Sequence, residues 1–150
     1  RRECHCTPYQ IQNYISKISG PLLDRIDIHV EVQNVQYKDL TSEATGVSSE
    51  EIREEVTKAR EIQLKRFQGL KYSTNSRMSA KTIKKHCALD SQAEELLHQA
   101  MTELSISARG YNKILKVGRT IADLDQSENV RIEHISEAVQ YRNLDRDLWK

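Results

Sequence analysis

The sequence has few residues that form turns and no long apolar run. Its 150 residues include five glycines and two prolines, too few for the many tight turns of an all-β protein. No apolar stretch approaches the roughly 18 residues that span a bilayer, and the first residues do not form a secretory signal. The composition therefore predicts a helix-rich, soluble, cytoplasmic protein and excludes membrane and secreted proteins.

Net charge and cysteine content exclude two further classes. Lys and Arg number 23 against 22 Asp and Glu, which gives a formal net charge of +1. The chain as a whole therefore has no electrostatic reason to bind nucleic acid or lipid, and any basic patch must be local. Three cysteines, an odd number without secretory features, argue against a disulfide framework and for reduced thiols or metal ligands.

The first part of the chain has the pattern of a piece of a larger α/β fold. Because the sequence opens at Arg1 and not at a methionine, we expect a segment of a longer protein. Apolar residues at helical spacing predict a short amphipathic helix over residues 8–18, which Gly20 and Pro21 end. Strict alternation of apolar and polar residues over 26–32 predicts one half-buried strand. No comparable stretch follows, so partner strands must come from outside this sequence.

From residue 48 onward the pattern predicts a helical bundle. Small polar residues over 41–49 form a linker, so we place a domain boundary between residues 1–47 and 48–150. Ser48 and Glu51 have the spacing of a capping box. Apolar periodicity predicts helices over residues 48–67, 79–86, 90–104, 107–125 and 131–142. The expected fold class is mainly α: a helical bundle preceded by a short helix and one strand left over from an α/β core.

Two features of these helices concern packing. The first long helix has one apolar face that we expect to be buried, made by Ile52, Val56, Ala59, Ile62 and Phe67. In the helix over 107–125, Gly118 lies on the apolar stripe, where its lack of a side chain would let another helix approach closely.

Arg109 is a candidate binding residue. If Ser107 caps the helix over 107–125, Arg109 lies in the first turn, where the helix dipole disfavours a cation. A phosphate bound there would meet both the helix start and a guanidinium. The alternative is a surface arginine that pairs with Glu103 or is hydrated.

Arg25 is a second candidate. It follows a rigid turn that starts at Gly20 and precedes the expected strand, so its side chain could project from the edge of a sheet. The alternative is an ion pair with Asp24 or Asp27, and the spacing alone does not separate these possibilities.

Several stretches resemble a known family. The string from Lys17 to Val30, KISGPLLDRIDIHV, closely resembles the arginine-finger segment of magnesium-chelatase-like AAA+ ATPases of the ComM/YifB type. The helical lid of that family is similar to SAR at 107–109, ILKV at 114–117, RTIADL at 119–124 and LDR at 144–146. The resemblance implies that Arg25 is a catalytic arginine finger that reaches the nucleotide site of the neighbouring subunit. It also implies that Arg109 is the nucleotide-binding sensor 2 residue, which contacts phosphate from the lid of its own subunit.

The resemblance also implies cofactors and partners for the complete protein. These are ATP and Mg²⁺, a homo-oligomeric ring such as a hexamer, and DNA that is remodelled in competence or recombination. Arginine suits both sites because a guanidinium bonds phosphate oxygens bidentately, and an arginine finger supplies about 10³- to 10⁵-fold in rate. The chain has no G-x-x-x-x-G-K-[S/T] and no Walker B strand before residue 26, so we expect it to hydrolyse no ATP alone.

Cys4 and Cys6 are candidate zinc ligands. Two thiolates supply half of a tetrahedral site, and the resemblance implies a second cysteine pair upstream that completes it. We expect zinc in the complete protein and not in this chain alone. Cys87 is expected to be a small apolar residue near a helix end.

A second hypothesis is a freestanding helical module that binds nucleic acid or protein. Residues 77–86 carry Lys81, Lys84 and Lys85, which form either a basic contact surface or an ordinary solvated face. The last two helices are similar to a helix-turn-helix, but residues 125–130 separate them by more than the 3 to 4 residues of that motif. A salt-dependent DNA titration distinguishes the hypotheses, because only a true module binds alone with a steep salt dependence.

Overall fold

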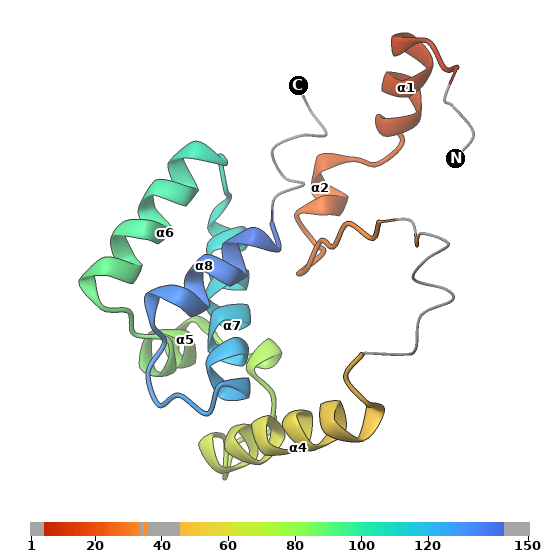
Figure 1. Ribbon diagram of the computed structural model, residues 1–150. Coiled ribbons are helices and arrows are strands. Elements are labelled where there is room, and N and C mark those ends of the chain that lie inside the picture. The colour runs from red at the N-terminus through yellow and green to blue at the C-terminus, as the bar shows by residue number, and fades with distance from the viewer. Residues whose placement is uncertain (1–4, 34, 36–45, 143–150) are drawn as a thin grey trace.

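The computed structural model describes residues 5–33, 35 and 46–142. These residues form α1 (Pro8–Ile15), α2 (Gly20–Leu23), α4 (Ser49–Arg66), the 3-10 helix η1 (Asn75–Arg77), α5 (Ala80–His86), α6 (Ser91–Glu103), α7 (Ala108–Leu124) and α8 (Ile132–Gln140). Figure 1 shows α4 to α8 gathered around α7, while α1 extends away from this bundle. The mainly helical fold class is confirmed.

Polar side chains start the helices where the sequence places them. The hydroxyl or carboxylate oxygens of Ser48, Asp90 and Ser107 accept the backbone N–H three residues later and cap α4, α6 and α7. In the predicted capping box, the Ser48 N–H also donates to Glu51 Oε2 at 2.8 Å, and this hydrogen bond lowers the pKa of Glu51. Each such cap stabilises its helix by about 1 kcal/mol, so local sequence sets the helix starts.

The core of the bundle lies around α7. It consists of Phe67, Met78, Ile83, Cys87, Ala93, Leu97, Ile106, Ile114, Leu115, Ala122, Val130, Ile135 and Ala138. A Cβ added at Gly118 would lie 2.9 Å from Ile135 Cδ1, closer than real Cβ contacts allow. The close approach of a second helix at Gly118 is therefore confirmed, and that helix is α8.

A buried polar cluster joins α4 and η1 to α7. The Asp123 carboxylate, 0% exposed, accepts hydrogen bonds from Arg66 and Asn75, both at 2.7 Å to Oδ2, and from Arg119 Nε at 3.1 Å to Oδ1. Burial lowers the pKa of Arg119, although Asp123 opposes this effect. No local sequence pattern indicates this cluster, because its members are up to 57 residues apart.

The apolar face expected on the first long helix is only half buried. Ala59 and Phe67 are buried, whereas Ile52 is 50% exposed and Val56 is 46% exposed. The reason is visible in Figure 1, where the first half of α4 extends beyond the bundle and has no helix against it. Helical periodicity predicted α4, but it does not indicate along how much of its length other helices pack against it.

The expected strand over 26–32 is wrong. Residues 26–33 adopt no regular secondary structure, and the part of the chain that the structure describes contains no strand with which they could pair. The alternating apolar residues are exposed, for example Val30 at 63% and Val32 at 86%, while the polar His29 between them is buried. The segment contacts the bundle through the His29 N–H, which donates to the Tyr141 carbonyl at 2.8 Å. Of the expected linker, residues 41–45 lie outside the described residues.

Candidate functional site

Arg109 lies in the first turn of α7, as the sequence predicts. The Ser107 hydroxyl caps the helix by accepting the Gly110 N–H at 3.0 Å. The Arg109 side chain is 59% exposed, and its Nη1 lies 3.6 Å from Asp24 Oδ2. The expected alternative partner, Glu103, forms no ion pair with it in the described part of the chain. Arg109 is thus a mostly exposed cation with one loose carboxylate partner.

The Asp24 carboxylate lies at the start of α7. Its Oδ1 accepts the Ser107 hydroxyl at 2.7 Å, across 83 residues of sequence. The first turn of a helix favours anionic groups because its backbone N–H groups have no partners within the helix. This end of α7, together with Arg109, therefore holds a negatively charged oxygen.

Arg25 follows directly after α2 and Asp24. Its guanidinium is exposed and donates from Nη1 to the Pro21 carbonyl at 3.3 Å. The alternative pairing with Asp24 or Asp27 is wrong, because Asp24 contacts Ser107 and Arg109 while Asp27 pairs with Lys113. The charged tip of Arg25 thus has no carboxylate partner among the described residues.

Lys113 holds the backbone next to Arg25. Its Nζ donates to the Arg25 carbonyl and lies 2.6 Å from Asp27 Oδ1. The Lys113 side chain is only 15% exposed. Lys113 was not among the predicted site residues, although it lies four positions after Arg109 and therefore on the same face of α7.

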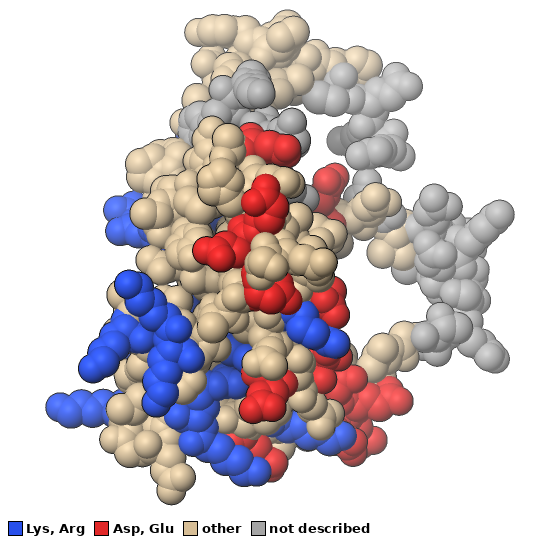
Figure 2. Space-filling model, turned by 90° about the vertical axis from the view of Figure 1, so that its left-hand side faces the viewer, with Lys and Arg blue, Asp and Glu red and all other residues tan. Residues whose placement is uncertain are grey.

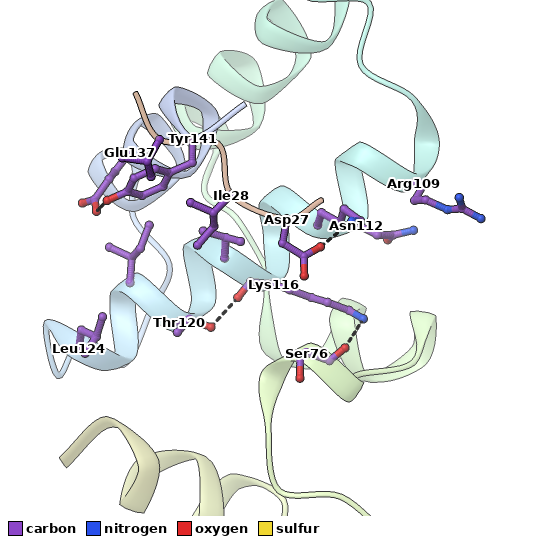
Figure 3. A pocket seen from close by; sticks show the side chains of 14 residues that line it. Asp27, Ile28, Ser76, Arg109, Asn112, Lys116, Thr120, Leu124, Glu137 and Tyr141 are labelled. Carbon is purple, nitrogen blue, oxygen red and sulfur yellow. Dashed lines mark hydrogen bonds and ion pairs between the residues drawn. The ribbon is translucent and has the colours of Figure 1, made fainter. Parts of the chain in front are cut away.

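A groove of about 830 Å³ lies between residues 27–30, one face of α7, η1 and the end of α8. Figure 3 shows Asp27, Lys116 and Thr120 inside it, whereas the Arg109 guanidinium extends away from it at one end. Lys116 Nζ donates to the Ser76 carbonyl at 2.8 Å. Tyr141 donates to Glu137 at 3.0 Å, which raises the pKa of Tyr141. The groove is lined by Arg109 but not by Arg25.

The cysteines differ in their surroundings. Cys4 lies outside the described residues, so the structure does not test the half zinc site. Cys6 is exposed, and residues 5–33, 35 and 46–142 contain no cluster of three or more His, Cys, Asp or Glu side chains that could hold a metal ion. Cys87 is buried in the core, and burial raises its pKa to about 11. Cys87 is therefore a protonated apolar residue at neutral pH, as expected.

Every helix in the described segments is too short or too polar to cross a bilayer.

Comparison with known proteins identifies the family. Residues 46–142 match the family described as magnesium chelatase, subunit ChlI C-terminal, and residues 1–40 match magnesium chelatase, subunit ChlI. The chain is 37% identical over 145 residues to competence protein ComM of Haemophilus influenzae, which covers 96% of this chain and 28% of that protein. It is also 37% identical over 142 residues to the uncharacterized protein YifB of Escherichia coli, covering 94% and 27% of the two. The chain thus spans less than a third of the length of these relatives. It belongs to the magnesium chelatase ChlI family and is related to ComM.

Proposed function

We propose that this chain is the C-terminal part of an AAA+ ATPase that works as a cytoplasmic ring, such as a hexamer. In this proposal, residues 1–47 belong to the ATPase core and residues 48–150 form its lid. Arg25 is the arginine finger for the neighbouring subunit, and Arg109 is the sensor 2 residue of its own subunit. The complete protein uses ATP and Mg²⁺ to remodel DNA, in competence or recombination.

The main support for this proposal is the anion at the start of α7. The Asp24 carboxylate accepts the Ser107 hydroxyl at 2.7 Å and lies 3.6 Å from Arg109. A phosphate oxygen is stabilised by the same groups as a carboxylate oxygen, namely N–H or O–H donors and a nearby cation. Because Arg109 is 59% exposed, most of its five N–H donors stay available for a phosphate.

The exposure of Arg25 also supports the proposal. A side chain that completes a site in the next subunit must be exposed in the isolated subunit. Both carboxylates beside Arg25 contact other residues, so its charge is not neutralised within the described part of the chain. Such a cation stabilises the charge that develops on the transferred phosphoryl group.

The residues fit ATP only in part. Arg25 and Arg109 offer guanidinium donors to phosphate, but the described residues offer no cluster of ligands for a metal ion, and the sequence has no phosphate-binding P-loop. In the proposal, Mg²⁺ and the nucleotide cradle are held by residues outside this chain. Cys4 and Cys6 supply half of a zinc site in the complete protein. We therefore expect no ATP hydrolysis by the isolated chain.

Mixed rings of the full-length protein test the two arginine roles. Arg25→Ala or Arg109→Ala is combined with a subunit whose nucleotide-binding motif is inactivated. We expect ATPase activity to return in the Arg25→Ala mixture, because the inactivated subunit still lends its finger. We expect no return for Arg109→Ala, because that residue acts on the nucleotide of its own subunit.

A matched control is Arg53→Ala, an exposed arginine of α4, which should leave the turnover unchanged. If Arg25→Ala and Arg109→Ala behave alike in mixed rings, the assignment of roles is wrong.

A second candidate function, nucleic-acid binding by the lid, has support from local charge. Residues 62–89 contain no Asp or Glu but carry Lys65, Arg66, Lys71, Arg77, Lys81, Lys84 and Lys85. Arg66 is bound to Asp123, whereas Lys71, Arg77, Lys81, Lys84 and Lys85 are exposed and form a basic surface. Figure 2 shows lysine and arginine side chains gathered on one part of the molecule. This local excess of charge fits the phosphates of a nucleic acid.

The triple variant Lys81→Gln, Lys84→Gln and Lys85→Gln tests this second function. In a DNA titration of the full-length protein at several salt concentrations, we expect weaker binding and a smaller salt dependence. The control replaces Arg53 and Lys58, which lie among the glutamates of α4. Equal binding by the triple variant and the control would refute a role of the basic surface.

A further inference from the structure

Lys113 connects helix α7 to the segment that carries Arg25. Its ammonium contacts two groups of that segment, the Arg25 carbonyl and the Asp27 carboxylate, the latter at 2.6 Å. These contacts join residues that are 88 positions apart in the sequence. Lys113 therefore fixes the backbone on the C-terminal side of Arg25.

Two further contacts hold the same segment. On one side of Arg25, Asp24 accepts the Ser107 hydroxyl at 2.7 Å. On the other side, Arg142 donates to the Ile26 carbonyl at 2.6 Å. Arg25 is thus flanked by contacts to the bundle, through the Asp24 side chain on one side and through the Arg25 and Ile26 carbonyls on the other, while the Arg25 guanidinium itself is exposed. This arrangement fixes the base of a side chain and leaves its tip exposed, with one long hydrogen bond to the Pro21 carbonyl, as a residue acting across an interface requires.

The Lys113 ammonium contacts residues 25–27 and no acceptor of its own helix. Lys113 lies in the interior of α7, away from the C-terminal turn, where a cation would favourably meet the helix dipole. Its side chain is 15% exposed, so its ammonium depends on protein acceptors more than a surface lysine does. The acceptors that it contacts both belong to residues 25–27.

Arg109 and Lys113 are one turn apart on α7. Arg109 contacts Asp24, and Lys113 contacts the Arg25 carbonyl. A shift of α7 that accompanies phosphate binding at Arg109 would move the backbone of Arg25 with it, because both contacts start from one rigid helix.

We infer that Lys113 is a positioning residue for Arg25, which makes α7 the physical link between the nucleotide site of one subunit and the finger that this subunit lends to its neighbour. The inference rests on the proposed function, in which Arg25 acts across the subunit interface. Lys113 itself touches no nucleotide in this scheme.

The test uses Lys113→Met and Lys113→Arg in the full-length protein, each alone and in mixed rings with a subunit whose nucleotide-binding motif is inactivated. Methionine nearly keeps the length of the stem but has no donor, so the Arg25 carbonyl and the Asp27 carboxylate lose the contact with α7 while the Asp24 and Ile26 contacts remain. We expect the kcat for ATP to fall roughly 10- to 100-fold, the cost of a small misplacement of a catalytic group, with the KM for ATP changed less than twofold. Lys113→Arg keeps a cationic donor and should retain most of the kcat.

Mixed rings separate positioning of Arg25 from damage to the lid. If Lys113 acts through Arg25, the inactivated neighbours supply a correctly held finger and restore turnover at the Lys113→Met sites. If the variant instead disturbs Arg109 or unfolds the lid, the defect stays in its own subunit and turnover does not return. The matched control Lys58→Met changes an exposed lysine of α4 and should leave kcat unchanged.

Three outcomes overturn the inference: a wild-type kcat for Lys113→Met, a reduced kcat that mixed rings do not restore, or a Lys113→Arg variant as impaired as Lys113→Met. The proposed function fails separately, when Arg25→Ala itself is not restored in mixed rings. Restoration of Arg25→Ala without restoration of Lys113→Met rejects only the role of Lys113.

Discussion

Replacing Asp123 by asparagine should destabilise the helical bundle severely. The carboxylate is 0% exposed and lies between the guanidinium groups of Arg66 and Arg119, whose side chains are 12% and 3% exposed. It also accepts the side-chain amide of Asn75 at 2.7 Å. Asparagine has nearly the same shape but no charge, and its NH₂ group would face donors where an acceptor is needed.

The size of the effect follows from the burial of the two arginines. Removing one partner of a buried ion pair costs about 3–5 kcal/mol, because the remaining charge is left without compensation. Here one carboxylate pairs with two guanidinium groups, so we expect the free energy of unfolding to fall by an amount within this range. For a bundle the size of residues 46–142, each kcal/mol of destabilisation lowers Tm by about 4–8 °C, so a loss of about 3 kcal/mol lowers Tm by at least about 12 °C. Total stabilities of about 5–15 kcal/mol mean that the variant could also fail to fold.

The assay is thermal unfolding of the chain followed by circular dichroism at 222 nm. The matched control is Asp125→Asn, two residues further along the chain, where the carboxylate is 53% exposed and lies 2.6 Å from Arg131 and 3.3 Å from His134 Nε2; the asparagine oxygen still accepts hydrogen bonds from both. An exposed ion pair contributes about 0–1 kcal/mol, so the control should change Tm by only a few degrees. Equal Tm values for the two variants would refute the conclusion that the buried cluster holds α4 and η1 on α7.

Three other changes test the packing and the cap. Gly118→Val should lower the free energy of unfolding by roughly 1–3 kcal/mol in urea titrations, because even its Cβ would lie 2.9 Å from Ile135 Cδ1; an unchanged midpoint would contradict the close helix contact. Ser107→Ala removes the cap of α7 and should lower the free energy of unfolding by about 1 kcal/mol in the same urea titrations. An unchanged free energy of unfolding would mean that water replaces the cap. Cys87, with its pKa raised from 9.0 to about 11 by burial, should react with a thiol reagent at pH 8 much more slowly than the exposed Cys6, and equal rates by mass spectrometry would contradict its burial. Because the thiol ionises more easily in the unfolded chain, the stability that Cys87 contributes should be complete below pH 9 and fall as the pH rises from 9 to about 11.

The sequence predicted those parts of the fold that depend on neighbours in the chain. The caps Ser48, Asp90 and Ser107 act on N–H groups three residues away, and apolar residues at helical spacing reveal a helix without knowledge of its partner. The expectation over 26–32 failed because alternation specifies a strand only when another strand is present to pair with it. Among the described residues there is none, and Val30 and Val32 remain exposed.

The candidate site was predictable only in its individual residues. Arg109 was recognisable as a cation in a first turn, where a helix does not favour one. That Asp24 is the carboxylate beside it could not be predicted, because 83 residues separate Asp24 from Ser107 and nothing periodic connects them. The same holds for Lys113, whose position suits any solvated face of a helix until the location of Arg25 is known.

The two faces of α7 show why packing and function differ in how far they can be predicted. One face carries Ile114, Gly118 and Ala122 at intervals of four, because burial against neighbouring helices requires an apolar residue at each turn. The other face carries Arg109 and Lys113, which are also four residues apart. Arg109 contacts Asp24 and Lys113 contacts the Arg25 carbonyl, so both reach the same short segment. Mutations on the first face should therefore change stability in proportion to buried volume, whereas loss of the Lys113 ammonium should change turnover more than Tm. In the proposed coupling between subunits, a shift at the nucleotide reaches Arg25 only if the core face of α7 stays packed, so the coupling requires the close contact of Gly118 with α8 and the buried contacts of Asp123.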